Sequence, residues 1–212
     1  MVGKIITVAQ QKGGSGKTTL AANLAVEFWK VGQRVAMVDI DPQGSLGRWF
    51  MTRADRPDLI NGLDFTTASA WGIEYETRKL VEAFDMVIID TPPKADSDLR
   101  PALRVADLVV VPISMSHVDV WATEGVLDLA AREEKQVAVV LNRARSGTRL
   151  AKDIINVTKT LPVHHIQTSL GNRVVYAEAM GQGIGASEAG RGPAHQEAAE
   201  LRSEVAHLLA SS

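Results

Sequence analysis

Short runs of Val, Ile and Leu alternate along the chain with longer stretches in which apolar residues recur at helical spacing. Most of the apolar runs are nearly continuous, which is typical of strands buried on both faces of a parallel sheet. The predicted strands are residues 5–10, 35–39, 65–68, 86–90, 108–112, 137–142 and 163–166. The predicted helices are residues 17–31, 73–83, 97–106, 117–132, 148–159, 172–181 and 194–210. This alternation predicts an α/β fold, with a mostly parallel β-sheet and helices on both of its faces.

Two polar stretches are predicted to be loops. Residues 53–62 contain Pro57 and Gly62, and residues 181–193 are rich in glycine. No internal repeat and no low-complexity linker interrupts the pattern. Because 212 residues suit one sizeable core, we expect residues 1–212 to form a single domain.

Composition excludes several classes of site. The chain has no cysteine, which excludes disulfides, thiolate metal sites, iron–sulfur clusters and a cysteine nucleophile. Its formal net charge is −2, so DNA binding would need a local basic patch or one that dimerisation assembles. No apolar run approaches the roughly 18 residues that span a bilayer, and the N-terminus lacks the pattern of a signal peptide. We therefore expect a cytoplasmic protein.

A glycine-rich segment, residues 12–19 (KGGSGKTT), follows the first predicted strand and opens the first predicted helix. Glycines let successive backbone N–H groups point at phosphate oxygens, and a helix N-terminus adds partial positive charge. Lys17 would reach the β- and γ-phosphates, and the Thr18 hydroxyl would ligate Mg²⁺. The residues expected to bind a nucleotide are Gly13, Gly14, Ser15, Gly16, Lys17, Thr18 and Thr19.

Polar residues end three of the predicted strands. Asp90 ends the hydrophobic strand 86–90, where a carboxylate beside a phosphate loop holds Mg²⁺ through water. Asp39 and Asp41 are two residues apart, so both could face the phosphates, although carboxylates at strand ends also suit plain turns. The amide of Asn142 suits the edge of adenine, and it equally suits a turn. Ligands of such sheets bind at the carboxyl ends of the strands, where all of these residues lie.

These motifs resemble those of one family. Residues 12–19 resemble the deviant Walker A motif of the ParA/MinD ATPases, and residues 39–44 (DIDPQG) are similar to the switch I motif of ParA-type proteins. Residues 90–122 look most like the short ParA-type partition ATPases, which lack an N-terminal helix-turn-helix. The resemblance covers nearly the whole chain and is weakest over residues 50–75 and after residue 180. It implies the P-loop NTPase fold, with ATP and Mg²⁺ as cofactors.

The resemblance also implies roles for individual residues. Lys12 matches a lysine that crosses a dimer interface to the partner's nucleotide, and Asp41 matches the residue that positions or activates the attacking water. We therefore expect Lys12, Lys17 and Asp41 to act in hydrolysis. The expected magnesium residues are Thr18, Asp39 and Asp90, and Asn142 is expected to contact adenine.

In this family the ATP-bound dimer binds DNA without sequence preference, and a partner protein stimulates hydrolysis. The resemblance implies an ATP-dependent homodimer, associated with the nucleoid, that positions or segregates DNA or a large protein cargo with a ParB-like or cargo adaptor partner. The candidate DNA-contacting residues, each of which also suits an ordinary solvated surface, are Arg143, Arg145, Arg149, Lys152, Arg173, Arg191 and Arg202.

Two other classes of function stay open. A MinD-like membrane switch needs a basic amphipathic helix. The predicted helix 194–210 has an apolar stripe of Ala198, Leu201, Val205 and Leu208, but its polar face carries three glutamates and only one arginine. We expect that stripe to pack on the core and no membrane to be bound. A metabolic ligase or kinase would need an acceptor site, and none is evident. Trp121 shares helical spacing with Val118 and Leu129, and we expect it to pack in the core or in a dimer.

The phosphate loop generates a first prediction. Replacing Lys17 with alanine removes the main phosphate cation of the loop, so the variant should no longer bind nucleotide. Calorimetric titration with ATP and Mg²⁺ measures this directly. Unchanged ATP affinity in a folded Lys17→Ala variant would contradict the assignment of the loop.

Overall fold

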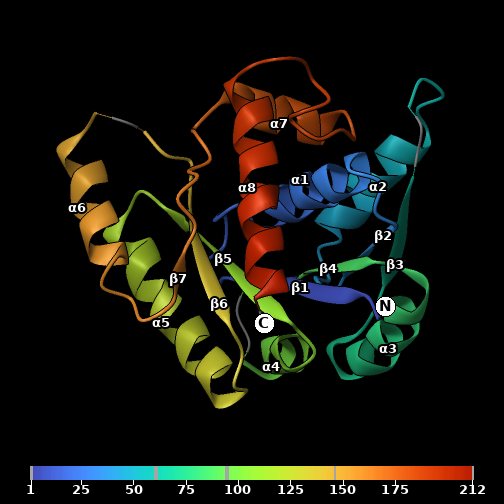
Figure 1. Ribbon diagram of the computed structural model, residues 1–212, viewed down its shortest axis with the longest axis horizontal. Helices are drawn as coiled ribbons and strands as arrows, with labels where there is room; N and C mark the ends of the chain where they lie inside the picture. The colour runs from blue at the N-terminus through green and yellow to red at the C-terminus, as the bar shows by residue number, and fades with distance from the viewer. Residues whose placement is uncertain (1, 60–61, 94–95, 146, 212) are drawn as a thin grey trace.

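The centre of the molecule is one parallel sheet. The computed structural model describes residues 2–59, 62–93, 96–145 and 147–211. Within these residues the strands are β1 (Lys4–Val8), β2 (Val35–Asp39), β3 (Leu63–Thr67), β4 (Met86–Asp90), β5 (Leu108–Ser114), β6 (Val137–Asn142) and β7 (His164–His165). Their spatial order is β3-β2-β4-β1-β5-β6-β7, and every described pairing is parallel (Figure 1).

Helices cover both faces of this sheet (Figure 1). One face carries α1 (Lys17–Lys30), α2 (Ser45–Ala54), α7 (Val174–Gly181) and α8 (Pro193–Ala210). The other face carries α3 (Ile73–Ala83), which follows the short 3-10 helix η1 (Ala70–Gly72), and then α4 (Asp96–Arg104), α5 (His117–Arg132) and α6 (Arg149–Thr158). No helix of the described residues is long and apolar enough to cross a membrane.

Strand side chains alternate between two apolar layers. In β4, Ile88 packs in the layer that contains α1 and α8, whereas Val87 and Ile89 pack in the layer that contains α3 and α4. Successive side chains of a strand point to opposite faces, so a strand covered on both faces needs apolar residues throughout. This arrangement accounts for the continuous apolar runs in the sequence.

The parallel register brings the polar strand ends together. Asp39, at the end of β2, stands opposite Asp90, at the end of β4, and Asp90 stands opposite Val8 of β1. The chain leaves β1 through the glycine-rich loop, so both carboxyl groups lie beside that loop. Asn142, at the end of β6, pairs with Ser114 of β5 on the same edge of the sheet.

The fold class predicted from the sequence is confirmed, and so is the packing of the α8 apolar stripe on the core, where Ala198, Leu201 and Val205 are all buried. Other boundaries differ by a few residues. The predicted strand 5–10 already ends at Val8, and the predicted strand 65–68 begins at Leu63. The predicted helix 172–181 begins two residues later, at Val174.

The pattern of apolar residues does not predict α2, and it wrongly predicts that a loop begins at residue 53. The buried positions of this helix are Leu46, Trp49 and Arg53, so its inward stripe ends in an arginine. A pattern of apolar spacing cannot identify a stripe that a charged residue completes. The helix begins after Gly44, which has a φ of 63° and so permits the sharp turn out of the preceding loop.

The Arg53 guanidinium is buried in the core and explains why the helix lies where it does. Its Cζ lies 5.4 Å from the ring centre of Trp29 and 5.7 Å from that of Trp49. Its two terminal nitrogens each donate to a carboxylate oxygen of Glu188 at 2.8 Å, and one also donates to the Gly183 carbonyl at 3.2 Å. A buried charge is tolerated only when it is paired and hydrogen-bonded in this way. The pair therefore fixes α2 to the segment that precedes α8.

This close packing generates a prediction for Gly183. Its φ is 69°, and an added Cβ would lie 2.4 Å from the backbone nitrogen of Arg53. Backbone strain and overpacking together should cost about 2–5 kcal/mol in the free energy of unfolding for Gly183→Ala. Denaturant titration measures this loss.

The matched control is Gly32→Ala. Gly32 has a φ of 88°, but nothing lies within 4 Å of the position that an added Cβ would take. This variant should therefore cost only about 1–2 kcal/mol, from the left-handed backbone alone. Equal losses in the two variants would mean that the contact with Arg53 has no effect on stability.

Candidate nucleotide-binding site

The loop between β1 and α1 needs glycine at two positions. Gly14 and Gly16 have φ values of 77° and 91°, which favour glycine. A Cβ on Gly16 would also lie 2.3 Å from the side-chain nitrogen of Asn142. Gly16 is the N-cap of α1 and supplies no side chain to the first backbone N–H groups of the helix. Those N–H groups and the positive end of the helix favour an anion in front of the loop.

Lys17 is buried beneath this loop. Its Nζ donates at 2.9 Å to the carbonyl of Gln10, which lies on the same connection between β1 and α1. Burial lowers the pKa of Lys17, while the carboxylates of Asp90 and Asp41 act to raise it. The amine is thus hydrogen-bonded to a neutral oxygen, and a phosphate placed at the loop would offer it a charged partner.

Asp90 and Thr18 form the centre of the site. The Thr18 hydroxyl donates to Oδ2 of Asp90 at 2.7 Å, whereas Oδ1 is buried without a hydrogen-bond partner among the described residues. Burial raises the pKa of Asp90 to about 7, and the hydrogen bond from Thr18 acts to lower it. The hydroxyl of Ser15 is likewise buried without a partner there. Orphaned buried oxygens are costly, and a hydrated Mg²⁺ would satisfy Oδ1.

Asp39 holds the backbone of the turn that follows β2. Its Oδ1 accepts from the N–H of Asp41 at 2.9 Å, and its Oδ2 accepts from the N–H of Gly47 at 3.1 Å. Burial raises the pKa of Asp39, and these backbone hydrogen bonds act to lower it. Asp41 is half-buried and accepts from the N–H of Gln43 at 2.9 Å. The two acids therefore differ: Asp39 shapes the turn, whereas Asp41 lies nearer to solvent.

The Lys12 side chain is paired with a carboxylate of its own chain. Its Nζ donates at 2.7 Å to Oδ2 of Asp119 on α5, and the Asp119 side chain is only 3% exposed. On the outer surface of the same helix, Val118 is 53% exposed and Trp121 is 64% exposed. The sequence predicts that Trp121 packs either in the core or in a dimer. Its exposure shows that it does not pack in the core of this chain.

Asn142 braces the phosphate loop against β6. Its Nδ2 donates to the Ser15 carbonyl at 2.8 Å, and its Oδ1 accepts from the backbone N–H of Arg143 at 2.9 Å. Arg143 has a φ of 52°, a value that is uncommon for a residue with a side chain and that often occurs beside functional sites. Both sides of the Asn142 amide are thus used within the chain.

A cavity of about 160 Å³ opens between the phosphate loop and the segment that leads into α7. It is lined by Gly16, Thr19, Asn142, Arg143, Gly171, Asn172, Arg173, Tyr176 and Ala177. No motif in the sequence points to Asn172 or Tyr176, because the segment that carries them follows a two-residue strand and irregular backbone. A single isolated bridge between Ala144 and Gly171 brings that segment to the site, and no pattern in the sequence signals it.

The candidate DNA-contacting residues do not form one group. Arg143 and Arg145 are exposed on the short segment that joins β6 to α6, and Arg149 and Lys152 are exposed at the start of α6. Arg173 instead pairs with Glu197. Arg191 is exposed in the loop before α8, whereas Arg202 is half-buried and its Nε has no hydrogen-bond partner among the described residues.

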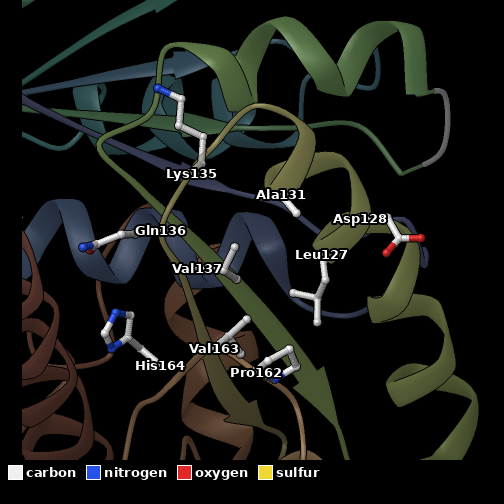
Figure 2. Close-up of a pocket in the computed structure, with 9 residues that line it drawn as sticks. All are labelled: Leu127, Asp128, Ala131, Lys135, Gln136, Val137, Pro162, Val163 and His164. Atoms are coloured by element: carbon white, nitrogen blue, oxygen red, sulfur yellow. The ribbon is translucent and has the colours of Figure 1, made fainter.

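Another cavity, of about 450 Å³, lies at the opposite end of β6 (Figure 2). Figure 2 shows the Asp128 carboxylate and the Lys135 amine pointing away from the apolar side chains of Leu127, Val137 and Val163. A catalytic site needs polar groups that converge, and here they diverge. Across the described residues, no group of three or more His, Asp or Glu side chains could hold a metal ion. A magnesium ion would accordingly need phosphate oxygens in addition to protein ligands, which is its usual mode of binding.

The comparisons with known proteins agree with this geometry. A family model described as the CobQ/CobB/MinD/ParA nucleotide-binding domain matches residues 6–184. The chain belongs to this family. A relative in this family, the maintenance of carboxysome distribution protein A of Halothiobacillus neapolitanus, is 29% identical over 195 residues, which cover 87% of each chain. The chromosome-partitioning ATPase Soj of Thermus thermophilus is 32% identical over 167 residues, which cover 66% of this chain and 65% of Soj.

Solved structures of family members share the fold. A variant of Cyanothece McdA in complex with ATP superimposes with a TM-score of 0.79 at 19% identity, and the match covers 98% of this chain and 96% of McdA. The cell division ATPase MinD of Pyrococcus furiosus also has a TM-score of 0.79, at 20% identity over 97% of this chain and 99% of MinD. At these identities the likeness establishes a shared fold and no more.

The raised pKa of Asp90 generates a prediction about pH. The unfolded chain ionises this carboxyl near the ordinary pKa of 3.8, whereas the folded chain holds the proton up to a pKa of about 7. The nucleotide-free fold therefore loses stability as the pH rises between these two values. Asp90→Asn removes the charge, so it should raise Tm relative to the unchanged chain at about pH 8 and do so much less at about pH 5. Thermal denaturation at both pH values measures the two differences.

Asp128→Asn is the matched control, because Asp128 is an exposed carboxylate on α5. We expect it to leave Tm nearly unchanged at both pH values. A gain from Asp90→Asn that is the same at both pH values would show that burial of the Asp90 charge does not destabilise the fold.

Proposed function

We propose that this chain is an ATPase that dimerises around ATP and, as the ATP-bound dimer, binds DNA without sequence preference to position a DNA or large protein cargo. The observation that carries the ATPase assignment is the Thr18–Asp90 hydrogen bond beside the buried Lys17, with Oδ1 of Asp90 left unpartnered among the described residues. These groups are the ones that a magnesium–triphosphate would satisfy. Family membership and the two relatives support the positioning role.

The residues divide the work of binding among them. The N–H groups of residues 13–19 and the Lys17 amine hold the phosphates, while Thr18 and Asp90 hold the magnesium shell, with Asp39 supporting it by fixing the switch turn. Bound Mg²⁺ would neutralise charge on the β- and γ-phosphate oxygens. The cavity beside Gly16 would take the nucleobase, with Asn142 bracing the loop next to it. Asp41, nearer to solvent than Asp39, orients the attacking water.

Lys12 and the outer surface of α5 support a dimer. For Lys12 to reach a second copy's nucleotide it must leave Asp119, and a buried carboxylate without its partner is costly. The exchange of one anionic partner for another would therefore make dimerisation depend on the nucleotide. Val118 and Trp121, exposed on the same helix, offer the apolar and aromatic contacts typical of the centre of an interface.

Four exposed basic residues around the start of α6 are the best candidates for DNA contacts. They are Arg143, Arg145, Arg149 and Lys152, and a dimer would present two such groups although each chain has a net charge of −2. Arg173 and Arg202 are less suited, because the first is paired with Glu197 and the second is half-buried.

The names of the relatives support both kinds of cargo. One relative maintains carboxysome distribution and the other partitions chromosomes. We propose that a ParB-like protein or a cargo adaptor stimulates hydrolysis and that the dimer is associated with the nucleoid. A MinD-like membrane role is less well supported, because the apolar stripe of α8 is buried against the core and its polar side carries Glu197, Glu200 and Glu204.

Sedimentation tests this function. The Asp41→Ala variant should bind ATP and hydrolyse it slowly, so with Mg²⁺–ATP it should sediment as a dimer and travel with non-specific duplex DNA. Without nucleotide, or with the Lys17→Ala change added, it should do neither. DNA affinity should fall at least about tenfold between roughly 50 and 200 mM salt, because phosphate contacts release counterions. The same sedimentation experiment is repeated with anionic vesicles in place of DNA.

Charge reversal locates the DNA contact. Arg149→Glu with Lys152→Glu should weaken DNA binding while the ATP-dependent dimer persists. Arg78→Glu with Lys79→Glu, the same change of charge on exposed residues of α3, should have little effect. Binding that ignores salt, or an ATP-independent oligomeric state, would contradict the proposal. Co-sedimentation with vesicles instead of DNA would favour a membrane switch.

A further inference from the structure

The outer wall of the cavity beside Gly16 is a segment that needs outside support. The wall is formed by residues 171–177, which follow the two-residue strand β7. Backbone hydrogen bonds attach its beginning to Ala144, whose N–H donates to Leu170 and whose carbonyl accepts from the N–H of Asn172. Two side chains of the wall, those of Arg173 and Tyr176, instead reach a different element, α8.

One carboxylate on α8 accepts hydrogen bonds from three of the residues that line the cavity. Glu197 Oε1 accepts from Nε and Nη2 of Arg173 at 3.0 and 2.6 Å. Glu197 Oε2 accepts from the Gly171 N–H at 3.1 Å and from the Tyr176 hydroxyl at 2.9 Å. Burial opposes ionisation of Glu197, but the hydrogen bonds from Arg173, Gly171 and Tyr176 outweigh it and lower the pKa of Glu197. Four donated hydrogen bonds thus converge on one ionised group.

The helix that carries Glu197 is a rigid support. Its residues Ala198, Leu201 and Val205 are buried in the core, and α8 packs along α1, the helix that the phosphate loop opens. Glu197 therefore ties the wall of the cavity to the same layer that fixes the phosphate loop. Tyr176 is buried and needs an acceptor for its hydroxyl, and Glu197 supplies it.

We propose that Glu197 is a positioning residue for nucleotide selection: by holding Gly171, Arg173 and Tyr176 it shapes the cavity that takes the nucleobase. This role rests on the proposed function, since it requires ATP at the phosphate loop. Glu197 contacts residues of the wall and does not itself line the cavity, so we expect its effect to be confined to the nucleoside half of the ligand. Arg173 then serves as part of the cavity wall and not as a DNA contact.

Glu204 provides a matched control on the same helix. It also holds the connection between β7 and α7, since its carboxylate accepts from the N–H groups of Gln167 and Thr168 and from the Thr168 hydroxyl. Neither residue lines the cavity. Glu197→Ala and Glu204→Ala therefore each remove one carboxylate anchor from the same segment, and only the first lies at the cavity wall.

Calorimetry with three magnesium-loaded probes, ATP, GTP and inorganic tripolyphosphate, tests the role. Glu197→Ala should weaken ATP binding about tenfold or more, because it leaves the hydroxyl of the buried Tyr176 without its acceptor and frees the wall. It should narrow the preference for ATP over GTP and leave tripolyphosphate affinity within about twofold of the unchanged chain. Glu197→Gln keeps an acceptor oxygen, so its ATP affinity should lie between those of Glu197→Ala and the unchanged chain. Glu204→Ala should bind all three probes as tightly as the unchanged chain.

Several outcomes would overturn the role. One is unchanged ATP affinity and base preference in Glu197→Ala, and another is an equal loss of ATP and tripolyphosphate binding, which would mark a general structural defect. The same selective loss in Glu204→Ala would also overturn it. If Glu197→Ala does not fold, Tyr176→Phe and Arg173→Met remove its partners one at a time and should reproduce the selective loss in part; no loss in either would refute the role.

The unchanged chain separates this inference from the proposed function. If it binds neither ATP nor tripolyphosphate, the proposed function fails and the role of Glu197 fails with it. If it binds ATP and tripolyphosphate with similar affinity, the cavity does not take the base, and only the role of Glu197 is overturned.

Discussion

A parallel sheet that is covered on both faces has room for polar groups only at the ends of its strands. Here the helices of both layers cover the sheet, and the interior of β4 is apolar on both sides. The parallel register then places the ends of β1, β2, β4 and β6 on one edge. The phosphate loop, Asp39, Asp90 and Asn142 meet there, where the strands leave the apolar core.

Burial gives the groups at this edge their chemistry, at a cost in stability. Lys17 is hydrogen-bonded to a neutral carbonyl, and Asp90 has a raised pKa and an oxygen with no partner among the described residues. A site that is complete only when its ligand arrives is expected to be unsatisfied without it. Arg53 differs, because its two terminal nitrogens pair with Glu188 and so place a helix, although its Nε has no hydrogen-bond partner among the described residues.

Three carboxylates act as braces around the phosphate loop. Asp39 holds backbone N–H groups of the turn after β2 and of α2, Asp119 holds Lys12, and Glu197 holds the wall of the cavity. Each one accepts donors from a segment that begins in irregular backbone, which has no ladder of its own to fix it. A brace of this kind fixes a loop through one charged partner, so exchange of that partner would release the loop without disturbing the core.

The sequence by itself determined the sheet, the phosphate loop and the acids at the strand ends, because these depend on local properties. The sequence alone shows continuous apolar runs, glycine-rich turns and carboxylates after a strand, whatever packs against them. Only the tertiary structure decided that Arg53 completes the buried stripe of α2, that Asn142 braces the loop, and that Arg173 faces Glu197. Lys12 and its partner Asp119 are 107 residues apart in the chain. Which donor such a carboxylate receives depends on how the two layers pack, and that information is not local.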